Sequence, residues 1–103
     1  MANLKGFQKK YLRGLAHAMR PVVIIGQHGL TDALLKSMEQ ALASHELVKV
    51  KFNDFKEKDQ KAEITEKLVK KTKASVAGAI GHTVIFYREN KDEEKRNIKL
   101  PKR

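Results

Sequence analysis

Residues 22–31 read VVIIGQHGLT, and the fold prediction starts from this stretch. Its first four residues are apolar and β-branched without polar alternation, so we expect a central strand at 22–25 that is buried on both faces. The residues GQHG at 26–29 break the strand, and Thr31 is suited to cap a following helix. The stretch therefore predicts a strand, a tight glycine loop and a helix in direct succession.

Upstream of this strand, apolar residues recur every three or four positions, a spacing that predicts an amphipathic helix. Pro21 should end the helix, because the residue before a proline avoids the α conformation. The apolar face of this helix is expected to consist of Leu4, Phe7, Tyr11, Leu12, Leu15 and Met19.

Downstream of the loop, apolar residues mark one face of a second helix that should run to about Ser44. Residues 47–53 read LVKVKFN, and this alternation predicts a strand with one wet, basic face. A third helix is expected from about 59 to 72, with a weaker pattern. Its inward residues should be Ala62, Leu68 and Val69.

Two short apolar runs, at 74–80 and 83–87, are joined by a Gly-His pair, which is typical of a β-hairpin. The predicted element order is α-β-α-β-α-β-β. Strands separated by helices should run parallel with right-handed crossovers, and the last two strands should be antiparallel. The predicted fold is therefore α/β, with helices packed on a four-stranded mixed sheet.

The chain has 103 residues, which is typical of one domain. We place that domain at 1–88. Residues 89–103 form a charged tail without clear periodicity, which we expect to be partly disordered.

The charge balance is strongly basic, with 22 Lys and Arg against 12 Asp and Glu, a formal net charge of +10. No acidic residue occurs within 1–31, although a solvated helix face would explain that segment equally well. A small basic domain is a candidate partner for phosphate backbones or acidic membranes.

Several function classes lack support in the sequence. The absence of cysteine excludes disulfide scaffolds, thiol nucleophiles and Cys-ligated metal sites. No apolar run approaches the roughly 18 residues of a membrane span, and with no secretory signal pattern we expect a cytoplasmic protein. The four histidines are scattered without ligand spacing, and no nucleophile elbow or phosphate-binding P-loop occurs. We therefore expect no enzyme activity, no cofactor, no metal site and no small-molecule substrate.

The glycine loop at 26–29 could bind an anion. It opens onto a capped helix whose first N–H groups are free, and glycines let a phosphate approach the backbone. Loops of this kind clamp the RNA backbone in KH modules. A plain strand-to-helix turn explains the loop equally well. The same spacing at 78–81 sits in an apolar strand, where close packing and turn geometry explain it.

Parallel strands place the loop at the carboxyl end of the sheet, where open α/β sheets bind ligands. We expect Lys5, Lys9 and Lys10 to approach the side of the loop, and Arg20 to lie at the opposite end. Aromatic residues are scarce, and no stacking platform is predicted. Recognition of structured RNA by shape and phosphate is therefore favoured over base reading.

Four ordered segments now support a family resemblance: YLRGLAH at 11–17, PVVIIGQHGLT at 21–31, HELVKVK at 45–51 and GHTVIFYR at 81–88. Together they resemble the CRM domain (chloroplast RNA splicing and ribosome maturation) over about residues 4–88. As a single copy, the chain is similar to bacterial YhbY-type proteins. The resemblance implies a fold similar to the C-terminal domain of bacterial translation initiation factor three.

The resemblance also implies a non-catalytic RNA-binding protein associated with precursors of the large ribosomal subunit. In this hypothesis the loop holds phosphate through Gly26, Gln27, His28 and Gly29. The residues expected to supply diffuse attraction are Lys5, Lys9, Lys10, Arg13, Lys49, Lys51 and Arg88. Alternatives are a permanent ribosomal protein, a general structured-RNA chaperone, or a membrane-surface or protein-adaptor module that uses the first helix. A DNA-binding architectural role is disfavoured, because no helix has a dense base-reading face.

Overall fold

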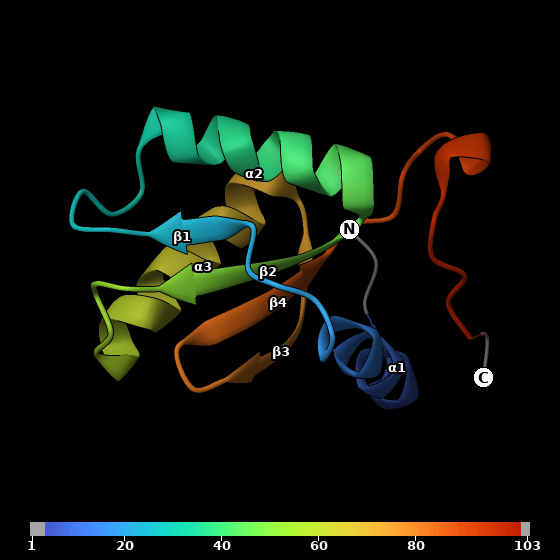
Figure 1. Ribbon diagram of the computed structural model, residues 1–103, viewed down its shortest axis with the longest axis horizontal. Coiled ribbons are helices and arrows are strands. Elements are labelled where there is room, and N and C mark those ends of the chain that lie inside the picture. The colour runs from blue at the N-terminus through green and yellow to red at the C-terminus, as the bar shows by residue number, and fades with distance from the viewer. Residues whose placement is uncertain (1–3, 102–103) are drawn as a thin grey trace.

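The computed structural model describes residues 4–101 and has the predicted order of elements (Figure 1). The helices are α1 (Gly6–Ala16), α2 (Asp32–His45), α3 (Lys58–Thr72) and the short 3-10 helix η1 (Glu93–Lys95). The strands are β1 (Val23–Ile25), β2 (Leu47–Phe52), β3 (Ser75–Ile80) and β4 (Thr83–Tyr87). Within the described residues, no helix combines the length and the apolar character needed to cross a membrane.

The four strands form one mixed sheet in the order β1-β2-β4-β3. β1 runs parallel to β2, while β4 pairs antiparallel with both β2 and β3. The predicted mixed sheet and closing hairpin are therefore confirmed. The predicted position of the first strand is wrong, because β1 lies at an edge of the sheet.

The expectation that β1 is buried on both faces is also wrong. Val23 and Ile25 are buried, but Val22 and Ile24 are each 52% exposed. Helix α2 covers one face of β1, whereas α1 packs on β2, β3 and β4 and leaves the other face of β1 open. The run of β-branched residues thus reflects strand preference and not burial on both faces.

The core is divided by the sheet into two clusters. The larger cluster lies between the sheet and the helices α2 and α3, and includes Met38, Val50 and Leu68. The smaller one lies between the sheet and α1, and includes Leu12 and Tyr87. Successive residues of a strand point to opposite sides of the sheet and therefore to different clusters. This explains the alternation in β2, whose Val and Phe residues face the larger cluster.

Helix α1 differs from its prediction in both length and burial. It ends at Ala16, before Pro21, and it buries Leu12 and Ala16 completely. The predicted inward residues Phe7 (36%), Tyr11 (42%) and Leu15 (39%) remain exposed. The apolar stripe is wider than the strip of sheet on which α1 packs, so one side of the stripe is left uncovered.

Helix α3 buries Ile64 and Leu68, with Val69 packed at the edge of the larger cluster. The prediction for Ala62 is wrong, because its side chain is exposed. Charged residues flank nearly every apolar position of this helix, so its inward face was poorly defined by periodicity.

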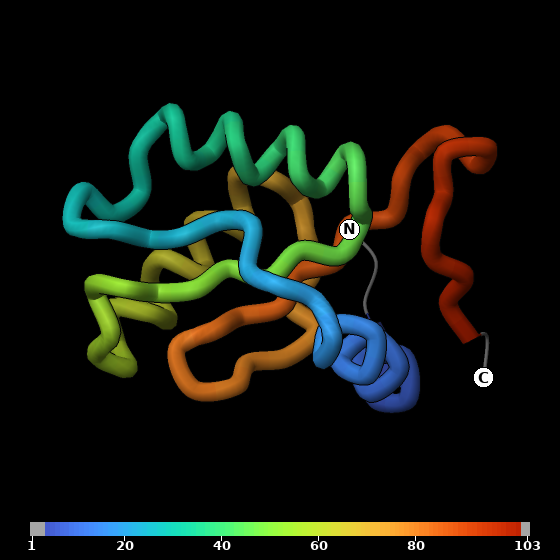
Figure 2. The backbone as a smooth tube through the Cα atoms, viewed as in Figure 1, coloured from blue at the N-terminus to red at the C-terminus, as the bar shows by residue number. Residues whose placement is uncertain are grey.

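The tail makes contacts with the domain that its composition did not predict. Residues 89–101 fold back beside α1 (Figure 2), where the side-chain amide of Gln8 donates to the Pro101 carbonyl at 3.0 Å. Ile98 and Leu100 pack against the smaller core cluster. These two apolar residues are too few to produce a periodic pattern, so the sequence gives no sign of this packing.

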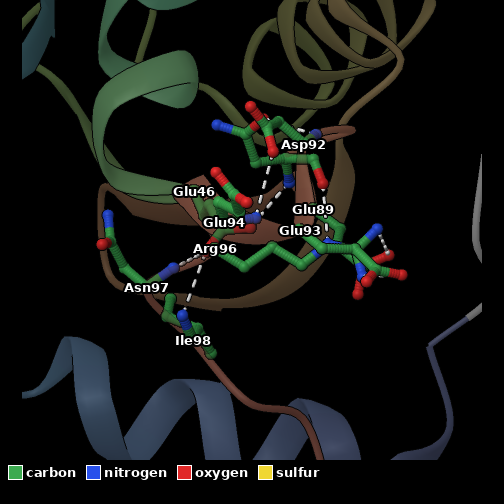
Figure 3. Close-up of polar contacts among 9 residues, drawn as sticks. Glu46, Glu89, Asp92, Glu93, Glu94, Arg96, Asn97 and Ile98 are labelled. Atoms are coloured by element: carbon green, nitrogen blue, oxygen red, sulfur yellow. Dashed lines mark hydrogen bonds and ion pairs between the residues drawn. The ribbon is translucent and has the colours of Figure 1, made fainter.

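A buried carboxylate anchors the tail. The side chain of Glu46, at the carboxyl end of α2, is fully buried and accepts three backbone N–H groups (Figure 3). The donors are Asn90 at 2.6 Å, Asn97 at 2.6 Å and Ile98 at 3.0 Å. No ion pair within residues 4–101 includes Glu46, so backbone donors satisfy this charge.

Candidate nucleic-acid interface

The glycine loop forms a tight turn at the carboxyl end of β1. The Gly29 N–H donates to the Gly26 carbonyl at 3.0 Å, which places Gln27 and His28 at the tip of the turn. Both tip residues are exposed. The turn therefore presents two polar side chains to solvent.

The structure explains the glycine at one position of the loop and not at the other. Gly29 has φ +65°, and an added Cβ would lie 3.2 Å from the Phe55 ring, so the fold requires glycine there. Gly26 has no left-handed backbone, and no atom lies within 4 Å of an added Cβ. The fold alone does not explain the glycine at 26, whereas a ligand approaching the backbone would.

Three segments lie at this end of the sheet (Figure 1). The Asn53 and Asp54 N–H groups donate to the Ile25 carbonyl, which ties the segment after β2 to the loop. The Phe52 N–H donates to the His82 carbonyl at 2.7 Å and so brings in the β3–β4 turn. Lys61 reaches this turn from α3, with Nζ 3.2 Å from His82 Nδ1.

The start of α2 is a weaker anion site than the sequence suggested. The Thr31 hydroxyl caps the helix as predicted, accepting the Leu34 N–H at 3.1 Å. However, Asp32 stands in the first turn and already complements the helix dipole with its negative charge. A phosphate would therefore be accommodated better at the tip of the turn than at the helix start.

Beside the loop, one row of the sheet is uncovered. The pairing register aligns Ile24, Lys51, Thr83 and Ile80 across all four strands, and we call these four residues the open row. They lie on the α1 side of the sheet but beyond the reach of α1, so Ile24 is 52% and Ile80 63% exposed. Lys51 stands between them and is exposed.

Charge differs between the two sides of the sheet. The four strands and α1 contain five basic residues and no acidic residue. All the acidic residues of the three long helices lie in α2 and α3, on the opposite side. The basic residues of the α1 side are Lys9, Lys10, Arg13, Lys49 and Lys51.

Comparison with known proteins decides the family. Residues 4–88 match the model of the CRS1/YhbY (CRM) domain. The chain belongs to the CRM domain family. An "RNA-binding protein" of Haemophilus influenzae is 40% identical over 103 residues, covering 100% of both chains. "Probable RNA-binding protein YqeI" of Bacillus subtilis is 37% identical over 98 residues, covering 95% of this chain and 99% of the relative.

A solved structure has the same fold. The solution structure of the hypothetical protein SAV1595 from Staphylococcus aureus superposes with a TM-score of 0.80. The two chains are 35% identical, and the match covers 96% of this CRM protein and 100% of the other chain.

Within this CRM domain, two predicted basic residues are held by internal contacts beside the open row. The Arg13 side chain lies over Gly78, where an added Cβ would fall 2.5 Å from Arg13 Cδ, and its Nη1 donates to the Ala77 carbonyl at 3.2 Å. Lys49 Nζ donates to the Met19 carbonyl at 2.9 Å. Both side chains thus add positive charge near Lys51 while also joining α1 and its connection to the sheet.

The other predicted residues are not brought to the loop. α1 lies away from the loop (Figure 1), so the expectation that Lys5, Lys9 and Lys10 approach it is wrong. Arg88 follows β4 at the opposite end of the sheet. Its Nη1 lies 2.9 and 2.8 Å from the two carboxylate oxygens of Glu39 and donates to the Thr72 carbonyl.

Sequence reasoning missed two groups at the same end of the sheet as the loop, Lys61 and His82, which contact each other at the β3–β4 turn. Neither is close to the loop in sequence, and only the insertion of β4 beside β2 brings them there. Among residues 4–101, no three His, Asp or Glu side chains converge as a metal site would require. The pKa of Tyr87 is raised to about 12 by burial and by the neighbouring Glu46 and Glu89, but this side chain lies in the core.

Proposed function

We propose that this CRM protein binds structured RNA, with the glycine loop and the open row forming the contact surface. The observation that carries the proposal is that α1 and the four strands contain five basic residues and no acidic residue, beside a loop whose Gly26 the fold does not require. The RNA-binding names of the relatives support the same class of ligand. The protein would act by binding, without catalysis.

In this proposal the phosphate backbone lies across the tip of the loop. Backbone and side-chain N–H groups of Gln27 and His28 would donate to phosphate oxygens, and Gly26 would let the phosphate approach. Lys51 would pair with a neighbouring phosphate, with Ile24 and Ile80 packing against sugars. Arg13 and Lys49 would contribute longer-range attraction. Such contacts read shape and charge more than base sequence.

A matched pair of substitutions tests the loop. Gln27→Glu at the tip and Gln40→Glu on the exposed surface of α2 make the same isosteric change and the same change in charge. Fluorescence anisotropy with a structured fragment of large-subunit ribosomal RNA would measure both affinities over a salt series. We expect Gln27→Glu to lose at least about tenfold more affinity than Gln40→Glu, because its carboxylate faces a bound phosphate. Equal losses would show that the loop is only a turn.

The cellular role that we propose is assembly of the large ribosomal subunit in the cytoplasm, in line with the CRM fold. Sucrose-gradient sedimentation at low salt should place the protein with immature large subunits. A protein found wholly at the top of the gradient would contradict this role. Near-stoichiometric presence on mature, salt-washed ribosomes would instead identify a permanent ribosomal protein.

A further inference from the structure

Tyr11 and Leu15 are exposed on α1, and they border a groove that the loop and the open row do not use. The groove lies between α1 and the tail and has a volume of about 360 Å³. This value falls in the range of roughly 300–1,000 Å³ that is typical of small-ligand sites. The main residues lining it are Tyr11, Leu15, Met19, His45, Ile98 and Lys99.

The composition of this groove fits a nucleotide. Its lining combines apolar and polar side chains and includes the ring of Tyr11, which is exposed although its helix packs on the sheet. No acidic residue lines the groove, whereas Lys99, His45 and Asn97 are among its lining residues. A partly apolar lining with an aromatic face and a lysine suits an unpaired base and its phosphate.

The tail forms the side of the groove that faces α1, and we call this side the second wall. The buried carboxylate of Glu46 fixes its position. Two of the three N–H groups that Glu46 accepts belong to Asn97 and Ile98, which form this wall. The wall lies beyond residue 88, where the match to the family model ends. The groove is thus built by the tail together with α1.

We propose that the groove between α1 and the tail holds an unpaired nucleotide of the bound RNA, with the base stacked on Tyr11. This inference rests on the proposed RNA-binding function and adds a second contact to it. The protein would then prefer structured RNA that carries a single-stranded extension. A protein segment, or a second copy of this chain, is the competing occupant of the groove.

The test compares a blunt RNA hairpin with the same hairpin carrying a short unpaired extension. The protein should bind the extended hairpin more tightly, by about fivefold to a hundredfold for one stacked base. Tyr11→Ala should remove this preference and leave the affinity for the blunt hairpin unchanged, whereas Tyr11→Phe should keep it. Phe7→Ala, an exposed aromatic truncation on the same helix but outside the groove, serves as the control and should also keep the preference.

A direct readout uses the absence of tryptophan from the chain. In Tyr11→Trp the indole is the only tryptophan, and a stacked base should quench its fluorescence when the extended hairpin is added. Equal affinity for the two hairpins, without quenching, would overturn the inference while the loop test above still stands. Binding of neither hairpin would overturn the proposed function as well. A dimer in sedimentation equilibrium that Tyr11→Ala dissociates would assign the groove to a second copy.

Discussion

Replacement of Glu46 by glutamine tests how the tail is held. The carboxylate accepts three N–H groups in a fully buried position, two of them on Oε1 and one on Oε2. An amide keeps one acceptor oxygen, but its NH₂ group then faces a backbone donor. The loss of one charge-assisted hydrogen bond costs about 1.5–3 kcal/mol, and a buried donor without an acceptor adds about 1–3 kcal/mol.

We expect these costs to act on the tail and not on the whole domain. Ile98 and Leu100 are only partly buried, so releasing the tail costs less than unfolding the sheet. Because the tail can be released without unfolding the sheet, the destabilisation of the attached tail is limited to about 2–4 kcal/mol. This free energy corresponds to an increase in amide exchange of roughly 30-fold to 1,000-fold.

Hydrogen exchange measured by NMR would follow the N–H groups of Asn90, Asn97 and Ile98 directly. Glu94→Gln is the matched control, because Glu94 is exposed in the same tail. We expect fast exchange of these three amides in Glu46→Gln and near-native exchange in Glu94→Gln. If both variants exchange alike, the buried carboxylate does not hold the tail and the reasoning is refuted.

Four further predictions concern the core, the loop and the open row. The hydroxyl of buried Tyr87 has no hydrogen-bond partner among the described residues, and its pKa is raised from 10.0 to about 12. The unfolded chain therefore ionises first, so wild-type stability should fall by about 2–3 kcal/mol relative to Tyr87→Phe between pH 10 and pH 12. Denaturation at several pH values would measure this, and a constant difference between the two proteins would contradict it. Gly29→Ala should destabilise the domain by about 1–2 kcal/mol, because φ is positive there and the Phe55 ring is close. Gly26→Ala should leave stability unchanged but weaken RNA binding, and an unchanged affinity in anisotropy would remove Gly26 from the interface. Lys51→Gln should lower the slope of log affinity against log salt by about 0.7–0.9, as expected for one lost phosphate contact, whereas an unaltered slope would place Lys51 away from the RNA.

Local sequence patterns predicted the order of elements well. The alternation at 47–53 predicted β2, and the turn at Gly81 predicted the start of β4. The cap at Thr31 placed the start of α2 correctly. These features depend on neighbours within a few residues. Propensity, periodicity and capping report such short-range preferences directly.

The errors arise from contacts between distant segments. β1 became an edge strand because β4 pairs with the other side of β2, a choice that no local pattern encodes. The order of the tail depends on Glu46, which lies 44 and 51 residues before Asn90 and Asn97. The sequence shows Glu46 only as one more acidic residue at a helix end.

The candidate site was predicted in the same uneven way. The position of the loop at the carboxyl end of β1 followed from the strand-loop-helix pattern and is confirmed. The pairing of Lys61 with His82 at the same end of the sheet did not follow, because α3 and the hairpin bring these two residues together. Arg88 was included for its charge, but the structure pairs it with Glu39 at the other end of the sheet.

The most direct test of the RNA-binding account maps the bound surface on the unaltered protein. Backbone amide NMR spectra would be recorded while a structured large-subunit ribosomal RNA fragment is added. We expect the largest shifts at residues 26–29 and at Lys51, with smaller ones along the rest of the open row. Shifts concentrated on the outer surfaces of α2 and α3, with the loop unmoved, would contradict the account.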